Sequence, residues 1–266
     1  MVFLKRSSRT VRGQGQENAA DPEQLRQGAG MEVVMKRIGI IGAMDEEVHI
    51  LKSRMQGAAV RTAASMEFCE GSLQGRNVVV VRCGIGKVNA AVCTQLLIDL
   101  FQVDAVINTG VAGSLRNEID IADIVLSSDT QQHDMDATGF GYPAGVIPRM
   151  EQSVFPADRR LVELAKQVCL ETLPGLGVHV GRIVSGDQFI SDQEKKVWLA
   201  EQFGGYCTEM EGAAIAQTAF LNQIPFLIIR AISDKADHSA EMSYQEFEEL
   251  AIRNTVKLLN GLLEKI

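Results

Sequence analysis

The chain has 266 residues, of which 46% are hydrophobic and 23% are charged, and its formal net charge is −8. This length and composition are typical of a globular protein with a substantial core. The acidic balance argues against nucleic acid as a partner, because nucleic-acid binders usually carry a basic patch. A membrane partner is not expected either, since no run reaches the roughly 18 apolar residues that a membrane-spanning helix needs.

The cysteines indicate free thiols rather than disulfides or a zinc site. Their number is odd and no C-x-x-C pair occurs. Cys83 and Cys93 lie among apolar residues, which favours burial. We therefore expect a protein of the reducing cytoplasm that holds no metal ion.

Residues 1–34 are predicted to form a disordered N-terminal extension. They are polar, rich in Arg, Gln, Glu and Gly, and poor in large apolar side chains. The first basic residues are not followed by an apolar run, so a secretory signal is not indicated. A transit peptide stays open beside the favoured interpretation, a native start at Met31 or Met35. Residues 35–266 are predicted to form one catalytic domain.

The folded part begins with a β-branched run that ends at Gly42, which predicts a buried strand. Asp45, Glu46 and Glu47 then predict the first turn of a helix, where acidic side chains complement the helix dipole. Further strands are expected at 60–62, 67–73, 77–83, 105–110, 123–129, 178–185 and 225–233, and helices at 87–101, 191–201, 208–221 and 243–264. The last three helices each open with a Ser or Thr followed three residues later by Glu, the pattern of a capping box: Ser191/Glu194, Thr208/Glu211 and Ser243/Glu246.

Apolar strands that alternate with helices predict an α/β domain built on a parallel or mixed sheet. Ligands of such sheets bind at the carboxyl ends of the strands. The polar residues expected at those ends are Glu46, Glu47, Asn108, Thr109, Ser185, Asp187, Ser233 and Asp234.

Three local patterns resemble other kinds of site but are incomplete. Gly39-x-x-Gly42 does not extend to the G-x-G-x-x-G of dinucleotide binding, and the Gly86-Lys87 pair lacks the remaining residues of a Walker A loop. His133 lies beside two aspartates, but no second histidine is spaced to complete a metal site. These segments are interpreted as turns and a polar loop.

Six segments, in this order, resemble the 5′-methylthioadenosine/S-adenosylhomocysteine nucleosidases of the nucleoside phosphorylase family: 38–47, 84–91, 108–113, 184–190, 209–214 and 230–234. The resemblance covers residues 36–265. It implies a homodimer with a single-domain three-layer α/β/α sandwich and a mixed central sheet. It also implies hydrolysis of the N-glycosidic bond without a cofactor, in methionine salvage and methyl-cycle detoxification.

Cleavage of a C1′–N9 bond passes through an oxocarbenium-like sugar, so it calls for an acid on the leaving purine and a base at the attacking water. Asp234 follows an apolar strand, where burial would favour the protonated form that can donate to purine N7, and Ser233 could orient it. Asp45, Glu46 and Glu47 are all available as the base from their position alone. The resemblance selects Glu47.

The other site residues are assigned by the resemblance. Glu211 is expected to hold the ribose hydroxyls and the water, although the Thr208/Glu211 capping box offers it a purely structural role. Arg230 would complete the water site. The remaining substrate-binding residues would be Met210 on the sugar, Gly113, and Phe68 and Tyr244 around the 5′-alkylthio group. The adenine would lie on Phe189, and backbone groups of Phe189 and Ile190 would contact its edge. Phe140, Tyr142 and Pro148 of a second subunit would close the pocket.

Val111 departs from the family, since many members have Ser at this position. A backbone group could replace the lost hydroxyl at the water. Among competing functions, a phosphate-dependent nucleoside phosphorylase would need cationic side chains such as Arg82 and Arg116 at the nucleophile, where Glu47 would instead repel phosphate. A futalosine-type nucleosidase shares the motifs, and a non-catalytic purine-binding protein should lack at least one of the three carboxylates.

Overall fold

The computed structural model describes residues 35–234 and 244–266. Residues 35–266 form one compact unit. The predicted N-terminal extension and the Ser243/Glu246 capping box lie outside the residues whose structure and side chains are described.

Within the described residues, ten strands form one sheet. They are β1 (Arg37–Gly42), β2 (Gln56–Ala63), β3 (Met66–Leu73), β4 (Arg76–Arg82), β5 (Ala105–Ser114), β6 (Ile124–Gln132), β7 (Val154–Pro156), β8 (Val178–Ser185), β9 (Cys207–Glu209) and β10 (Phe226–Asp234). The helices are α2 (Asp45–Arg54), α3 (Lys87–Phe101), the 3-10 turn η1 (Thr138–Phe140), α4 (Arg159–Thr172), α5 (Gln193–Phe203), α6 (Gly212–Leu221) and α7 (Tyr244–Lys265).

The sheet is mixed, which confirms the predicted fold class. β1 pairs in parallel with β4 and β5, whereas β3 lies antiparallel to both β2 and β4. β10 pairs with β5 and β6, β6 with β8, β8 with β9, and β9 again with β5. These five strands therefore close into a ring, and β1 to β4 extend from it.

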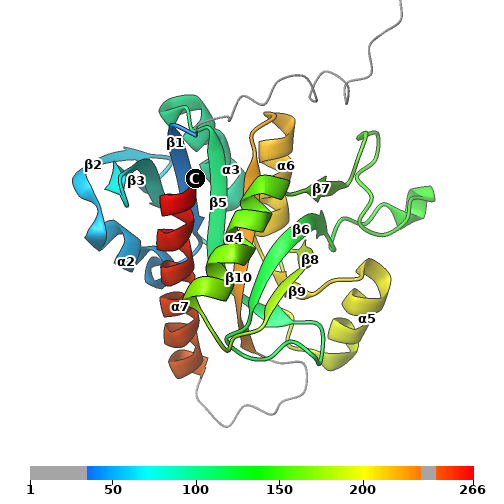
Figure 1. The fold of residues 1–266 in the computed structure, drawn as a ribbon. Coiled ribbons are helices and arrows are strands. Elements are labelled where there is room, and N and C mark those ends of the chain that lie inside the picture. Colours follow the sequence, from blue (N-terminus) through cyan, green and yellow to red (C-terminus); the bar gives the residue numbers. More distant parts are fainter. Residues whose placement is uncertain (1–34, 235–243) are drawn as a thin grey trace, which may run out of the picture. The chain divides into compact units, whose positions relative to one another are not determined.

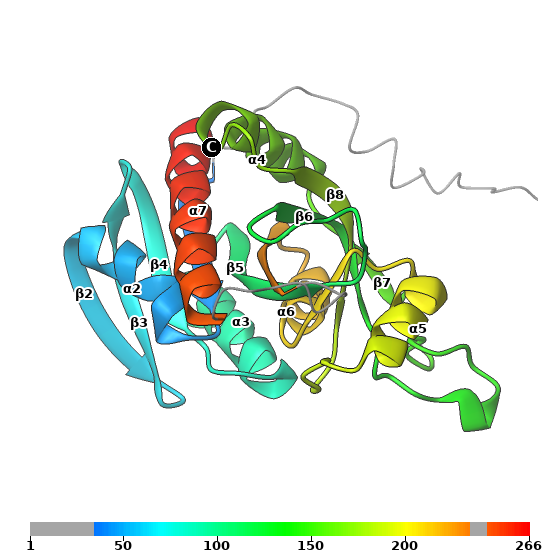
Figure 2. The same ribbon diagram turned by 90° about the horizontal axis from the view of Figure 1, so that it is seen from below.

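Helices cover both faces of the sheet (Figure 1). α2, α4 and α7 pack on one face, and α3 and α6 pack against each other on the opposite face, with α5 beside the ring (Figure 2). Strands covered on both sides should be apolar throughout. Val78 to Val81 of β4 are accordingly 0% exposed, as are Leu227 to Ile229 of β10.

Two local predictions were wrong in instructive ways. The helix expected from Thr208 begins at Gly212, because Thr208 lies in β9 and extends the ring. α5 is capped by Asp192, whose carboxylate accepts from the Lys195 N–H at 2.8 Å, rather than by Ser191.

Helix α4 was not predicted, although its signals are present in the sequence. The Asp158 carboxylate accepts from the Leu161 N–H at 2.9 Å and caps the helix. The buried residues of α4 repeat at helical spacing: Leu161, Val162, Ala165, Val168 and Cys169.

All five cysteines are buried and unpaired, as expected for Cys83 and Cys93. Burial raises the pKa of the Cys83 and Cys169 thiols to about 12, which leaves both protonated and unreactive at neutral pH. Within residues 35–234 and 244–266, no helix has the length and apolar character needed to cross a membrane.

Candidate active site

A cavity of about 180 Å³ lies where the carboxyl ends of β1, β5, β9 and β10 meet. Its walls combine apolar side chains with four carboxylates. The lining residues are Ala43, Met44, Glu47, Ile85, Val111, Ala112, Gly113, Phe189, Thr208, Glu209, Met210, Glu211, Ser233 and Asp234. The position agrees with the rule that ligands of α/β sheets bind at the carboxyl ends of strands.

Glu47, in the first turn of α2, presents its carboxylate to this cavity. Its Oε2 accepts from the Ala43 and Met44 N–H groups at 2.6 and 3.1 Å, which is the structural role open to an acidic residue at a helix start. Its Oε1 accepts from the Val111 N–H at 3.2 Å. Burial raises the pKa of Glu47, an effect that the positive charge of Arg230 partly offsets. A carboxylate with a raised pKa is a stronger proton acceptor than an ordinary one.

Arg230, 1% exposed, lies behind the carboxylates rather than among the residues that line the cavity. Its Nη2 donates to Asn108 Oδ1 at 2.6 Å and forms a closer ion pair with Glu209. It also lies 3.9 Å from Glu211 Oε2. The predicted role at the water is therefore indirect, because Arg230 reaches the cavity only through the carboxylates that it holds.

Glu209 is the main partner of Arg230, and sequence reasoning gave it no role. Burial raises the pKa of its carboxyl, but Arg230, the Ser185 hydroxyl and the Gly212 N–H together outweigh burial and hold that pKa below its ordinary value. Glu209 also accepts from the Glu211 and Gly212 N–H groups at the start of α6. It is thus the residue that caps this helix.

Because Glu209 caps α6, the side chain of Glu211 does not have the capping role that the Thr208/Glu211 pattern predicted. Its Oε1 accepts from the Gly86 N–H at 2.8 Å. Burial and the negative charge of Glu209 raise the pKa of Glu211 to about 7. The carboxyl can therefore exchange a proton or a hydrogen bond with a polar ligand in the cavity near neutral pH.

Two glycines in β5 leave space for these groups. A side chain at Gly110 would overlap the Arg230 guanidinium and the Glu47 carboxylate, and one at Gly113 would come within 3.0 Å of the Asp234 carboxylate. The strand expected at 105–110 is longer in the structure and continues to Ser114. The glycines are needed because functional side chains from α2 and β10 cross the strand at these points.

Asp234 ends β10 and lines the cavity beside Ser233, whose Oγ lies 3.3 Å from Asp234 Oδ1. The expected burial of Asp234 was wrong, since its side chain is 35% exposed. It instead forms an ion pair with Lys196 of α5, with Nζ 2.7 Å from Oδ2.

The predicted substrate contacts fall into two groups. Phe189 and Met210 line the cavity, and Phe189 is 76% exposed, so its ring is available to a ligand. The side chain of Ile190 lies in a small apolar cluster beside the cavity lining, and its backbone contact with adenine stays a prediction. Phe68 is also elsewhere, fully buried and stacked on Phe101 with ring centroids 4.9 Å apart, so its assignment to the alkylthio pocket is not supported.

Tyr244 is the first residue of α7, and its side chain lies outside the described part of the structure. Phe140, Tyr142 and Pro148 belong to the segment between β6 and β7, which extends away from the sheet (Figure 2). They do not line the cavity of their own chain, and Phe140 is 88% exposed.

The groups that could bind phosphate or a metal ion have other partners. Arg82 pairs with Asp45, and Arg116 stacks 4.0 Å over the Tyr206 ring. Asp134, next to His133, pairs with Lys87 at 2.6 Å. Among the described residues, no group of three or more His, Cys, Asp or Glu is arranged to hold a metal.

Replacement of Glu211 by Gln should stabilise the protein at alkaline pH. Because the folded-state pKa of about 7 exceeds the ordinary 4.5, the folded protein binds more protons than the unfolded chain between these values. Stability contributed by the protonated form is therefore complete below about pH 4.5 and is lost as the pH rises through about 7. Gln carries no charge, so Glu211→Gln should raise the free energy of unfolding at pH 8 by on the order of 1–3 kcal/mol.

Urea denaturation of both proteins at acidic and alkaline pH measures this effect. The exposed Glu201 provides the control, since Glu201→Gln should follow the wild-type pH dependence. If the free energy of unfolding depends on pH equally in wild type and Glu211→Gln, then ionisation of Glu211 does not destabilise the folded protein.

Comparison with known proteins gives one consistent result. The phosphorylase superfamily model matches residues 37–264. A 5′-methylthioadenosine/S-adenosylhomocysteine nucleosidase of Exiguobacterium is 42% identical over 231 residues, covering 86% of this chain and 98% of the relative. The nucleosidase of Neisseria meningitidis in complex with methylthio-immucillin-A superposes with a TM-score of 0.82 at 39% identity, covering 87% of this chain and all of the other. That of Colwellia psychrerythraea in complex with adenine gives 0.81 at 39% identity, covering 86% and 95%.

Proposed function

Because the chain belongs to the phosphorylase superfamily, we propose that it hydrolyses the N-glycosidic bond of 5′-methylthioadenosine and S-adenosylhomocysteine to adenine and the 5′-substituted ribose. The observation that carries this proposal is the convergence of Glu47, Glu211 and Asp234 on one cavity that Phe189 and Met210 also line. The relatives at 42% identity are named for this activity.

Asp234 acts on the purine side of the scissile bond. As a neutral carboxyl it donates its proton to N7, so that adenine leaves as a neutral base. The exposed ring of Phe189 stacks on the adenine and keeps N7 toward β10. The proximity of Ser233 Oγ to Asp234 Oδ1 orients the carboxyl.

Glu47 and Glu211 act on the sugar side. Glu47 takes a proton from the attacking water, and Glu211 accepts hydrogen bonds from the ribose hydroxyls. The Val111 N–H donates to Glu47 Oε1 at 3.2 Å, although the side chain of Val111 has no hydroxyl to offer. The backbone thus orients the base, and no side chain is required at position 111 for that purpose.

Water rather than phosphate is the nucleophile that this site accommodates. The loop before α3 could offer backbone N–H groups to an anion, but the Gly86 N–H is bonded to Glu211 and the Lys87 N–H to Asp187 Oδ1 at 2.8 Å. Phosphate would also meet Glu47 and Glu209 at close range. Two loop donors that a phosphorylase would use for phosphate are therefore taken by carboxylates.

Dialysed enzyme should release adenine from 5′-methylthioadenosine at the same rate with and without added phosphate, because no step uses phosphate. Adenine release from 5′-methylthioadenosine, S-adenosylhomocysteine, 5′-deoxyadenosine and aminodeoxyfutalosine, followed by chromatography, tests both reaction and substrate class. A strict phosphate requirement with a ribose-1-phosphate product would identify a phosphorylase. A preference for aminodeoxyfutalosine alone would identify the alternative nucleosidase.

The catalytic domain comprises residues 35–266, and we propose that it works as a homodimer in the cytoplasm. Buried unpaired thiols suit a reducing compartment. Large apolar side chains are exposed at the start of α3 and at the cavity mouth, with Val88 74%, Ile85 57% and Phe189 76% exposed. Exposed apolar groups that adjoin a ligand cavity are typical of an interface, and a second subunit could insert Phe140, Tyr142 and Pro148 there.

Val88→Glu should convert the dimer to monomers, because it places a charge among the exposed apolar side chains Ile85, Val88 and Phe189. The same change should lower adenine release if the second subunit closes the pocket. Light scattering after size exclusion gives the mass, and Val60→Glu on the exposed strand β2 is the matched control. A monomeric wild-type enzyme at full activity would refute the dimer.

A further inference from the structure

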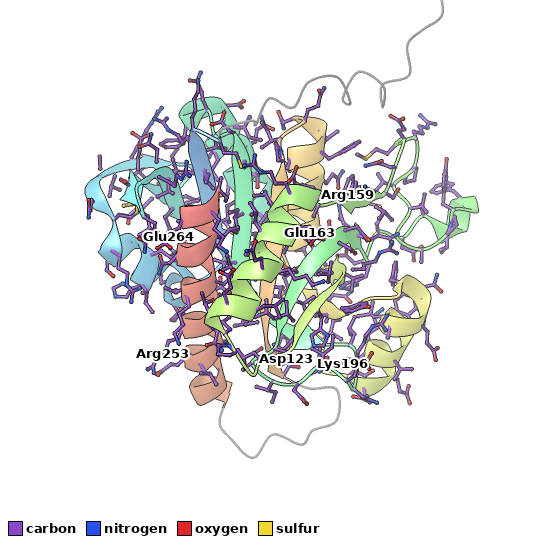
Figure 3. The ribbon with its side chains drawn as sticks, viewed as in Figure 1. Asp123, Arg159, Glu163, Lys196, Arg253 and Glu264 are labelled. Carbon is purple, nitrogen blue, oxygen red and sulfur yellow. The ribbon has the colours of Figure 1, made fainter. Side chains whose placement is uncertain are left out.

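Lys196 lies between two cavities. It belongs to α5 at the end of the sheet where the chain leaves β10 (Figures 1 and 3). Its side chain is only 5% exposed, and its Nζ contacts Asp234 Oδ2 at 2.7 Å on the side of the substrate cavity. It also lines a second cavity of about 370 Å³ between α5 and the segment after β5.

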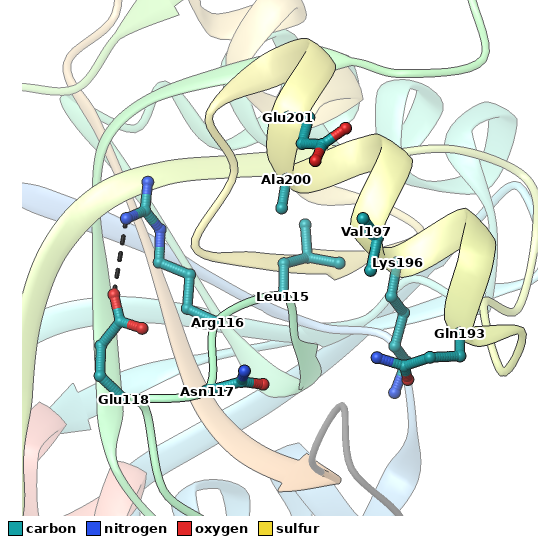
Figure 4. Close-up of a pocket in the computed structure, with 9 residues that line it drawn as sticks. All are labelled: Leu115, Arg116, Asn117, Glu118, Gln193, Lys196, Val197, Ala200 and Glu201. Carbon is teal, nitrogen blue, oxygen red and sulfur yellow. Dashed lines mark ion pairs between the residues drawn. The ribbon is translucent and has the colours of Figure 1, made fainter.

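The second cavity reaches solvent. Its lining includes the exposed side chains of Asn117, Glu118 and Glu201 (Figure 4). The charged groups around it are Arg116, which pairs with Glu118 at 3.5 Å, and Glu201. Lys196 points from α5 toward the end of β10 (Figure 4). Lys196 thus contacts Asp234 and also borders a cavity that reaches solvent.

We propose that Lys196 resupplies the proton that Asp234 gives to the leaving base, by passing a proton from the second cavity to Asp234 Oδ2. This inference rests on the proposed function, because it assumes that Asp234 is the general acid. Lys196 acts through Asp234, so it is a positioning residue rather than a catalytic one.

The structure gives a physical reason for such a step. Lys196 and Asp234 form an ion pair with Nζ 2.7 Å from Oδ2, and a carboxylate in an ion pair has no proton to give to N7. A nucleoside that fills the cavity expels water, and two opposite charges that lose their solvation become costly relative to the neutral pair. The Nζ–H bond of Lys196 then breaks as the O–H bond of Asp234 forms, which leaves an amine and a carboxyl.

The proton balance closes over one turnover. Asp234 donates its proton to adenine N7 and returns to a carboxylate. The Lys196 amine takes a proton from water in the second cavity and restores the ion pair. The proton that the attacking water loses to Glu47 leaves to solvent, so the reaction consumes water and no net proton.

Lys196→Ala and Lys196→Arg separate the supply of a proton from the presence of a positive charge beside Asp234. Arg keeps the positive charge and the ion pair, but its guanidinium does not give up a proton in proteins. If Lys196 supplies the proton, both variants should lose on the order of 10²-fold in single-turnover adenine release, with nucleoside affinity within about threefold of wild type. Near-normal turnover in either variant would overturn the proposal. Lys195→Met is the matched control, since Lys195 packs over the Trp198 ring instead.

Chemical rescue gives a readout that a purely structural role would not produce. Ethylammonium should restore turnover to Lys196→Ala, because the enlarged cavity can admit an amine that carries a transferable proton. Tetramethylammonium, which has the charge but no proton, should not. Rescue by both ions, or by neither, would contradict proton supply.

A double-variant experiment checks that Lys196 works through Asp234. On an Asp234→Asn background, Lys196→Ala should cause no further loss, because no acid remains to be recharged. Additive losses would overturn the proposal. A wild-type enzyme that releases no adenine would instead refute the proposed function itself, so the two failures are distinguishable.

Discussion

Asp234→Asn is expected to bind adenine nucleosides nearly as well as the wild type and to lose about 10²–10⁴-fold in turnover. The Asn amide can donate a hydrogen bond to purine N7, which preserves binding, but it cannot transfer a proton. The change is nearly isosteric, and Gly113 leaves room for either side chain. The loss therefore reports on proton transfer.

The same residue predicts the choice of base. A protonated Asp234 donates to N7 with one oxygen and accepts from the exocyclic N6 amine of adenine with the other. Hypoxanthine has a carbonyl at that position, which faces an acceptor and remains unpaired. A site built around such a hydrogen bond can discriminate by about 10⁴-fold.

Single-turnover release of the base from 5′-methylthioadenosine and 5′-methylthioinosine, by wild type and Asp234→Asn, measures both effects. Thermal melting of the variant shows whether the fold is kept. Equal wild-type rates on the two substrates, or near-normal turnover by Asp234→Asn, would remove Asp234 from the acid role.

Glu47→Gln should remove base catalysis while nucleoside affinity stays within about threefold, because Gln keeps the size of the side chain and can still bond to water. General base catalysis is typically worth about 10²–10⁴-fold. Gln can still accept from the Ala43 and Met44 N–H groups through its one carbonyl oxygen, so the start of α2 should remain intact. Its amide NH2 then stands where Glu47 Oε1 accepts from the Val111 N–H, so that one hydrogen bond is lost.

Glu46→Gln is the matched control for this experiment. Glu46 is the preceding residue of α2, but it is exposed and lines a different cavity. Presteady-state adenine release and inhibitor titration should show a deficit in kcat for Glu47→Gln alone. Similar deficits in both variants would mean that the acidic helix start matters for the helix rather than for the water.

Most of the fold could be predicted because the signals are local. The apolar strands β1, β4 and β10 and the helix at Lys87–Phe101 follow from periodicity and composition. The cavity position follows from the rule on strand ends. The sequence predicted that Glu47, Ser233 and Asp234 lie together at the carboxyl ends of the strands, and all three line one cavity.

The remaining features depend on contacts between distant segments. Glu209 forms the ion pair with Arg230 and caps α6 because β9 places it in the ring of strands. A strand of three residues is too short to show a recognisable sequence pattern, so this placement could not be predicted. Lys196 looks like one of two surface lysines until α5 turns it toward β10. Phe68 was assigned to the substrate by resemblance, whereas the pleat of β3 turns it toward Phe101.

The ring of strands sets a condition on when the site can first exist. Of the strands that the structure describes, β10 is synthesised last, and it pairs with both β5 and β6. Until it arrives, the ring is open, those two strands present unpaired edges, and Arg230 and Asp234 are absent from the cavity. A nascent chain that has not yet delivered β10 therefore cannot cleave a nucleoside, and it exposes the edges by which incomplete sheets associate.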